Sequence, residues 1–240
     1  MDATLRPKDP IAPQLFAKLR QAIIEMTLRP GEALSEKEIA SRFGVSRQPV
    51  REAFIKLSEA GLLQILPNRG TFVVKISVRE VANARFVREA VEVGIARSAS
   101  QMMTNAQIDG LYACIERQRE SVANADHRQL NVLDDAFHRA IADVVDCDYA
   151  SRIVEGARAQ TDRVRYLGLW HATPMTILVQ QHTAIVEALA QRDPDAAELA
   201  TRRHLREILI ALPLIAQNFP DLFEDRDLPA HTAMLQVGKP

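Results

Sequence analysis

Residues 35–51 read SEKEIASRFGVSRQPVR, and this stretch decides the fold of the N-terminal part of the chain. Ser35 and Glu38 form a capping-box pattern, which predicts the start of a short helix. Gly44 can adopt the left-handed conformation that ends this helix, and Ser46 is an N-cap residue for another helix directly afterwards. The stretch therefore predicts two helices that meet at a tight turn.

The flanking segments complete this unit. Upstream, apolar residues at helical spacing predict a helix over about 12–26, which ends before the Arg29-Pro30-Gly31 triplet. Downstream, the helix that starts at Ser46 runs to about Ala60, and strand-like segments at 62–66 and 71–74 flank a turn at 67–70. Three helices followed by a β-hairpin predict a winged helix-turn-helix within residues 1–76.

The second helix of the pair carries candidate DNA-reading residues. Arg47 and Arg51 lie four residues apart on one face, with Gln48 beside them, in the first turns of the helix that would enter a major groove. The forked donors of arginine match the O6 and N7 acceptors of guanine. The alternative is that both arginines are solvated surface charges. The capping pattern, the glycine turn and the hairpin occur together, however, and favour a role of the arginines in DNA recognition.

Other residues of this unit are candidate DNA contacts. Arg69 and Gly70 at the hairpin turn can follow the DNA backbone into a minor groove. The alternative is that these residues serve only to form the turn. Lys37 and Thr71 are candidates for phosphate contacts.

Beyond residue 76 the chain reads as all helix. A short linker is expected at 77–78, within the stretch Lys75–Val78, and a helical domain at 79–223 precedes a polar tail at 224–240. The helices are expected at 79–103, 105–124, 127–145, 149–170, 174–192 and 194–217.

Composition agrees with two domains in a reducing cytoplasm. Of the 240 residues 47% are hydrophobic, and only two are cysteines, Cys114 and Cys147, which are too far apart in sequence for a metal-ligand motif. We expect no signal peptide and no membrane span. The net charge is −1, but residues 1–76 hold 12 Lys/Arg against 8 Asp/Glu and the remainder holds 18 against 23. A basic part suited to phosphate therefore precedes an acidic part.

The motifs of the first 76 residues resemble the GntR family of bacterial regulators. The resemblance rests on the Arg-Pro-Gly triplet at 29–31, the Leu-Ser-Glu triplet at 34–36 and three further motifs at 43–47, 49–53 and 67–70. It implies homodimers that bind short palindromic operators. The residues it implies at the DNA are Lys37, Ser46, Arg47, Gln48, Arg51, Arg69 and Gly70.

The C-terminal half resembles the all-helical, FCD-type ligand-binding domain of the FadR-like subfamily. The matching residues are Arg88 with Glu92, then Asp134 with Phe137 and His138, and finally His182 and His204. Members of the subfamily that respond to fatty acyl-CoA lack the metal residues. The presence of these residues here therefore points away from an acyl-CoA effector.

Four of these residues form a candidate metal site. Asp134 and His138 stand at positions i and i+4 of one predicted helix, so their side chains can chelate one ion. His182 and His204 lie among apolar neighbours and are expected to face the interior, where the alternative is a hydrogen-bonded core histidine. One carboxylate and three imidazoles suit zinc first, with nickel, iron(II) or manganese as alternatives.

A divalent ion with open coordination positions suggests a small organic acid as effector. Arg88 could pair with the far end of such a carboxylate, or it could form an ion pair with Glu92 at i+4. Arg163 and Arg165 are weaker candidates for the same role.

Three functions are compatible with these features. The leading hypothesis is a dimeric, ligand-responsive transcriptional regulator, coupled through the short linker. The second is a regulator that senses the metal ion itself. The third is a metal-dependent enzyme fused to a DNA-binding unit, for which the sequence offers no dedicated base or nucleophile.

Overall fold

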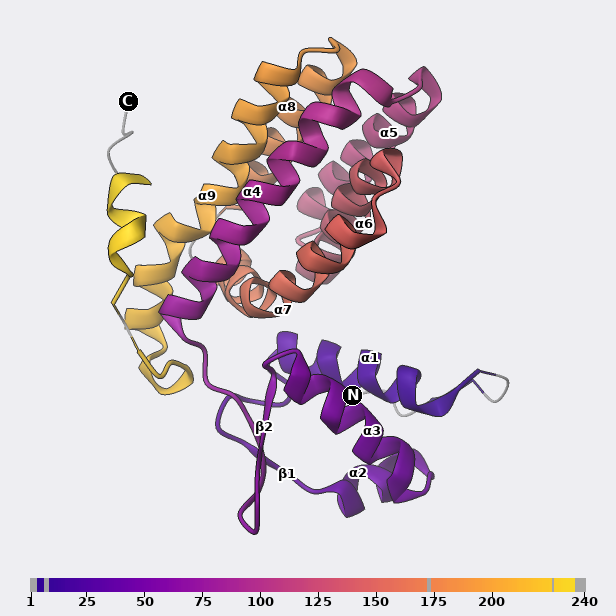
Figure 1. Cartoon of the computed structure of the whole chain (residues 1–240), viewed down its shortest axis with the longest axis vertical. Coiled ribbons are helices and arrows are strands. Elements are labelled where there is room, and N and C mark those ends of the chain that lie inside the picture. The colour runs from indigo at the N-terminus through magenta and orange to yellow at the C-terminus, as the bar shows by residue number, and fades with distance from the viewer. Residues whose placement is uncertain (1–3, 7–8, 172–173, 226, 236–240) are drawn as a thin grey trace.

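The computed structural model describes residues 4–6, 9–171, 174–225 and 227–235. Figure 1 shows a small N-terminal unit of helices and strands below a bundle of long helices. The predicted fold class, a winged helix-turn-helix followed by an all-helical bundle, is confirmed.

The N-terminal helices begin and end close to the predicted positions. They are α1 (Ile11–Ile24), α2 (Glu36–Phe43) and α3 (Arg47–Glu59). The Ser35 hydroxyl accepts a hydrogen bond from the Glu38 amide at 3.4 Å, which is one half of the predicted capping box. Gly44 has a φ of 64° and ends α2 as expected. Ser46 is the N-cap of α3, although its side chain makes no capping hydrogen bond.

The sheet holds one strand more than the sequence predicted. The expected hairpin consists of β2 (Leu63–Leu66) and β3 (Gly70–Val73), and β1 (Ala33–Leu34) pairs with the free edge of β3. All pairs are antiparallel, in the order β1-β3-β2. A two-residue strand is too short to show alternation in sequence, which explains why β1 was missed.

Six long helices form the C-terminal unit, each within two residues of its predicted bounds. They are α4 (Val78–Met102), α5 (Asn105–Ala123), α6 (His127–Val145), α7 (Asp148–His171), α8 (Met175–Ala190) and α9 (Pro194–Asn218). In the part of the chain that the structure describes, no helix is both long and apolar enough to cross a membrane.

The expected linker at 77–78 and the first two residues of the expected tail, Glu224 and Asp225, are bonded to each other's segments in the structure. Ser77 is the N-cap of α4, and Val78 is its first residue. The side chain of Asp225 accepts hydrogen bonds from the Ser77 hydroxyl and the Val78 amide, and the Glu224 amide donates to Ile76. The short 3₁₀ helices at Pro220–Leu222 and Ala230–Leu235 were not predicted.

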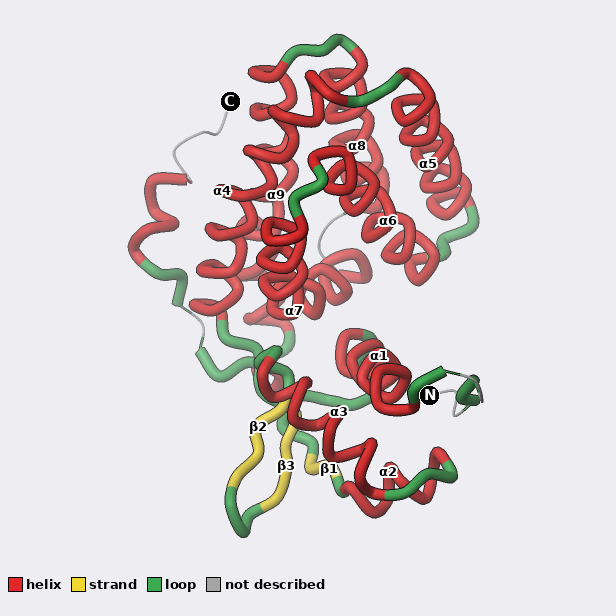
Figure 2. The backbone as a smooth tube through the Cα atoms, turned by 45° about the vertical axis from the view of Figure 1, so that its right-hand side comes forward, coloured by secondary structure: helices red, strands yellow, loops and turns green. Residues whose placement is uncertain are grey.

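Helix α7 lies at the junction between the two units, directly above α1 in both Figure 1 and Figure 2. Its Ala159 is buried in the core of the N-terminal unit, among residues of α1, α2 and α3. Arg163 is fully buried and donates to the Val74 carbonyl at 2.6 Å, and Gln160 donates to the Gly61 carbonyl at 3.3 Å. The two units therefore share packed side chains in addition to the chain connection.

Candidate metal centre and DNA interface

One face of α3 is buried and the opposite face is open to solvent. Val50 and Phe54 pack into the core of the N-terminal unit, whereas Arg47, Gln48 and Arg51 are exposed. The predicted recognition residues therefore share one accessible surface, in the first turns of the helix.

Glu36, in the first turn of α2, holds both arginines. Its Oε2 accepts hydrogen bonds from Nη2 of Arg47 at 2.8 Å and Nη2 of Arg51 at 3.1 Å. Its Oε1 accepts from Nε of Arg51 at 3.1 Å. The hydrogen bond from Arg51, with a smaller contribution from Arg47, lowers the pKa of the Glu36 carboxyl although partial burial opposes this shift. The two guanidinium groups are thus kept side by side by one ionised carboxylate.

The remaining DNA candidates lie on the accessible side of the same unit. Lys37 is exposed in the first turn of α2, and Ser46 is exposed in the turn between α2 and α3. Arg69 and Gly70 are exposed and Thr71 is half-buried in the hairpin, which projects away from the helical bundle in Figure 2.

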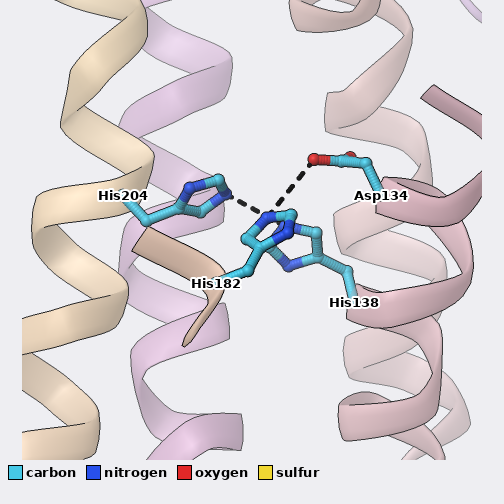
Figure 3. A group of neighbouring side chains, drawn as sticks. All are labelled: Asp134, His138, His182 and His204. Carbon is cyan, nitrogen blue, oxygen red and sulfur yellow. Dashed lines mark hydrogen bonds and ion pairs between the residues drawn. The ribbon is translucent and has the colours of Figure 1, made fainter. Parts of the chain in front are cut away.

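The four predicted metal ligands come together from three helices. Asp134 and His138 lie one turn apart on α6, His182 comes from α8 and His204 from α9 (Figure 3). One ligand atom from each residue lies within 4.8 Å of all the others. All four residues are buried.

The distances between the inward-facing atoms fit a shared ion. Nε2 of His138 lies 3.0 Å from Nε2 of His204, and Nε2 of His182 lies 3.5 Å from Oδ1 of Asp134. Two ligand atoms that each bind a metal at about 2.0–2.1 Å are separated by distances of this order. His182 Nε2 and Asp134 Oδ1 are both buried and have no hydrogen-bond partner among the described residues.

The outward-facing nitrogen of each histidine has a polar partner. His182 Nδ1 lies 2.8 Å from Oε1 of Gln118, and His204 Nδ1 lies 3.2 Å from Oε1 of Gln181. His138 Nδ1 lies 2.9 Å from Oε2 of Glu92. Since these oxygens accept hydrogen bonds, each Nδ1 carries the proton and each Nε2 directs its lone pair to the centre.

The electrostatics of the cluster favour metal-binding protonation states. Burial lowers the pKa of His182 to about 3 and holds the pKa of His204 well below its ordinary value. Burial alone would raise the pKa of Asp134, but Arg165 and the nearby histidines lower it below the ordinary value. Neutral imidazoles and an ionised carboxylate are the forms that bind divalent metals. The geometry and the protonation states therefore both fit a divalent transition metal.

The candidate ligand-binding arginines have different surroundings. Arg88 donates from Nε to Glu92 at 2.7 Å and from Nη1 to Thr161 at 3.2 Å, so the structure shows the i+4 ion pair that the sequence offered as the alternative. Arg165 is paired with Asp134. Arg163 instead contacts the N-terminal unit, as described above.

Two cavities lie against the cluster. The larger, of about 250 Å³, includes His138, Glu92 and Arg158 in its wall, together with Arg20 of α1. The smaller, of about 70 Å³, includes His204, Gln181 and Arg88. Pockets that hold drug-sized molecules measure roughly 300–1,000 Å³, so the larger cavity suits a small metabolite.

Sequence reasoning missed several residues of these sites. Gln118 and Gln181 contact the histidines, Arg158 lines the larger cavity, and Glu36 holds the two arginines. Glutamine carries no metal-ligand signal, and nothing in a linear pattern shows that α5 faces α8. Glu36 was visible only as a first-turn acid.

Two protein-family models match consecutive parts of the chain. The model described as "Bacterial regulatory proteins, gntR family" matches residues 11–73, and the model described as "FCD domain" matches residues 84–207, just over half of the chain. The chain belongs to the GntR family. Its FCD domain places this GntR protein in the FadR-like subfamily, which confirms the resemblance inferred from the motifs.

Relatives of known name support the same assignment. The GntR protein is 41% identical over 225 residues to the HTH-type transcriptional repressor RspR of Escherichia coli K12. The aligned residues cover 94% of this chain and 99% of that protein. It is 35% identical over 209 residues to a regulator of Streptomyces ambofaciens, covering 87% and 88%. The family and these relatives are transcriptional regulators rather than enzymes.

Solved structures share the fold. Escherichia coli McbR/YncC superposes with a TM-score of 0.77 at 17% identity, over 88% of this chain and 99% of that one. A putative GntR regulator from Rhodococcus sp. RHA1 gives a TM-score of 0.69 at 25% identity, over 83% and 98%. This GntR protein is therefore a DNA-binding transcriptional regulator with an FCD domain.

Proposed function

We propose that this GntR regulator binds a palindromic operator as a homodimer, represses transcription there, and is controlled by a small carboxylate metabolite bound at a metal ion in the FCD domain. The convergence of Asp134, His138, His182 and His204 on one buried point carries the proposal. Repression rests on the name of the relative RspR. Operator binding would place its action in the cytoplasm.

A zinc ion fits the four ligands, and nickel, iron(II) or manganese are the alternatives. Three imidazoles and one carboxylate leave coordination positions open in five- or six-coordinate geometries. When bound, the ion would supply a Lewis-acidic contact for a carboxylate oxygen. The outer hydrogen bonds that the histidine Nδ1 atoms donate to Glu92, Gln118 and Gln181 would fix the orientation of the rings.

The charges around the cluster favour an anionic effector. Four arginines pair with four carboxylates there: Arg20, Arg88, Arg158 and Arg165 with Glu92, Asp134, Asp135 and Asp162. A divalent cation adds two positive charges to this balanced set. Because uncompensated buried charge is costly, an anion that binds with the metal would be stabilised.

Two arginines are candidates to hold that anion. Arg88 lines the smaller cavity but already donates to Glu92 and Thr161. Arg158 lines the larger cavity, and its Nε and Nη2 are buried with no hydrogen-bond partner among the described residues. We therefore add Arg158 to Arg88 as a proposed ligand-binding residue.

Coupling to the DNA-binding unit has a route besides the chain connection. Arg165 of α7 contacts Asp134 and also Asp162, at 3.2 Å, and Asp162 accepts a hydrogen bond from Arg20 of α1 at 2.6 Å. Three ion pairs in series would thus join the metal ligand Asp134 to α1, the helix that packs against α3. A difference of ~1–3 kcal/mol in effector affinity between the DNA-competent and DNA-incompetent dimers would suffice for a switch.

The same ion pairs support one alternative, in which the metal itself is the effector. A cation bound to Asp134 would weaken the pull of that carboxylate on Arg165, so the signal would need no organic acid.

Operator affinity under three conditions separates these functions. A duplex selected from a random library by the purified protein serves as operator, and its affinity is measured with metal-free protein, with zinc-loaded protein, and with zinc plus a panel of small carboxylates. A change only in the third condition supports the proposal. A change with zinc alone supports metal sensing, and identical affinity in all three refutes control through this site.

A further inference from the structure

The arrangement of Glu36, Arg47 and Arg51 goes beyond DNA contact by two arginines. We propose that Glu36 is a specificity-determining residue of operator recognition: it positions the two arginines for guanine and keeps them from binding phosphates indiscriminately. The inference rests on the proposed role of Arg47 and Arg51 in the major groove.

Glu36 has the geometry of a shared clamp. Its carboxylate binds Arg51 through Nε and Nη2 together, and its Oε2 also accepts from Nη2 of Arg47. A two-point contact fixes the plane of a guanidinium group as well as its position. The exposed fraction of the Glu36 side chain is 22%, against 62% and 52% for Arg47 and Arg51. The carboxylate therefore lies under the arginines, on the protein side.

This placement leaves the outer donors of both arginines available. Arg51 uses Nε and one Nη2 hydrogen on Glu36, so its Nη1 group and the other Nη2 hydrogen remain as an end-on fork. Such a fork matches the O6 and N7 acceptors of guanine. Arg47 uses only Nη2 on Glu36, so its remaining donors can bind guanine in a neighbouring base pair.

Charge gives the second half of the argument. Two arginines one helical turn apart repel each other and, without Glu36, would each bind the nearest phosphate. Phosphate contacts strengthen binding to every sequence alike and carry no sequence information. Glu36 neutralises part of their charge and opposes phosphate binding, so it should lower affinity for random DNA while it preserves affinity for the operator.

The test compares Glu36→Gln with Glu38→Gln in the full-length protein. Glu38 is exposed in the same turn of α2 and bonds neither arginine, so its substitution removes the same charge without opening the clamp. Operator sequences are selected from a random duplex library by each variant, and affinities for the wild-type operator and for a scrambled duplex are measured by fluorescence anisotropy at two salt concentrations.

We expect the ratio of operator to scrambled affinity to fall at least about fivefold in Glu36→Gln relative to Glu38→Gln. The selected motif should become degenerate at the base pairs that Arg47→Ala and Arg51→Ala also relax, and the salt dependence should steepen. Glu36→Asp keeps the charge but shortens the reach, so it should show the same loss of selectivity and decides the matter if the glutamine variant folds poorly.

Equal ratios and equal motifs in the Glu36 and Glu38 variants would overturn the inference and leave the proposed function standing. A wild-type protein that selects no motif at all would instead refute the proposed operator reading, and the inference with it.

Discussion

At the residue scale, we expect Arg47 and Arg51 to select the operator sequence and the neighbouring Lys37 to bind phosphate. Arg47→Ala or Arg51→Ala should weaken operator binding about tenfold to a hundredfold and relax base preference, because a bidentate contact to guanine is lost. Lys37→Ala should weaken binding to all sequences similarly and lower the salt slope by about one. Anisotropy titrations with the operator and a scrambled duplex measure both effects. Unchanged operator affinity in both arginine variants would disprove the recognition-helix assignment.

The metal centre makes an equally direct residue-scale prediction. His138→Ala and His182→Ala should reduce bound metal from about one ion per chain to a small fraction, as measured by elemental analysis after dialysis. Gln118→Ala, which removes the partner of His182 Nδ1, should weaken metal affinity by a smaller factor of roughly 10–100. His231→Ala changes an exposed histidine and serves as the control. Full occupancy in both ligand variants would refute the site.

The buried histidines also predict a pH dependence of the metal-free protein. Burial depresses the pKa of His182 from its ordinary value of 6.5 to about 3. Between these values the unfolded chain binds a proton that the folded chain does not, so the free energy of unfolding falls as the pH falls through this window. Thermal unfolding at pH 7 and pH 5 should show this loss, and His182→Gln should reduce it. A wild-type midpoint that does not change between the two values would contradict the prediction.

What the sequence revealed at this scale depended on residue type. The four candidate metal ligands were predicted because Asp134 and His138 stand at helical spacing and because the order of all four residues resembles the FadR-like pattern. Their partners Gln118 and Gln181 were not, since the contact of a glutamine with a histidine depends on which helices face each other.

At the scale of elements, periodic helices and segments with capping or turn residues were predictable, whereas elements that depend on a distant part of the chain were not. Helices α4 to α9 follow their apolar patterns to within two residues. Strand β1 exists only because β3 offers it an edge, and Ser77 caps α4 where a linker was expected. The sequence did not predict that α7 packs against the N-terminal unit, because nothing in the pattern distinguishes Ala159 from other small helical residues.

Helix α7 leads to a prediction about signal transfer. Asp162→Asn weakens the ion pairs of this side chain with Arg165 and with Arg20, so the effect of metal or carboxylate on operator affinity should shrink about 2- to 30-fold while metal content stays unchanged. The measurement is operator affinity with and without effector, beside metal analysis.

A second ion pair between the two units provides the control for this experiment. Glu25 binds Arg128 at 3.1 Å, and the Arg128 side chain is 76% exposed, so solvent screens the pair. Glu25→Gln should leave the response intact. A full response in Asp162→Asn would show that the signal travels elsewhere.

At the scale of the whole molecule, we propose that a group of exposed apolar side chains forms the surface on which a second copy of the chain packs. Leu199, Ile210 and Leu214 of α9 are 71%, 73% and 48% exposed. Leu199 and Ile210 are separated by three helical turns and so share a face. Phe86 and Val87 are exposed on the adjacent α4. Exposed apolar surface of this kind is typical of interfaces between chains.

The proposed dimer can be tested on this surface. Ile210→Glu should shift the protein towards monomers in sedimentation analysis, because a charge would be buried between copies. Ile55→Glu alters an exposed isoleucine of α3 and should leave the oligomeric state unchanged. A dimer that survives Ile210→Glu at micromolar concentration would move the interface to another face.

The packing of α7 also bears on how such regulators can be recombined by engineering. Because Ala159 completes the core of the N-terminal unit and Arg163 and Gln160 bind its backbone, an exchange of the first 76 residues for those of another regulator would leave these side chains facing unfamiliar partners. A working chimera would need matching substitutions on α7 as well as a suitable joint near Ser77. A functional exchange would therefore have to include the α7 surface that contacts the N-terminal unit as well as residues 1–76. For the same reason, the two units should unfold in a single thermal transition.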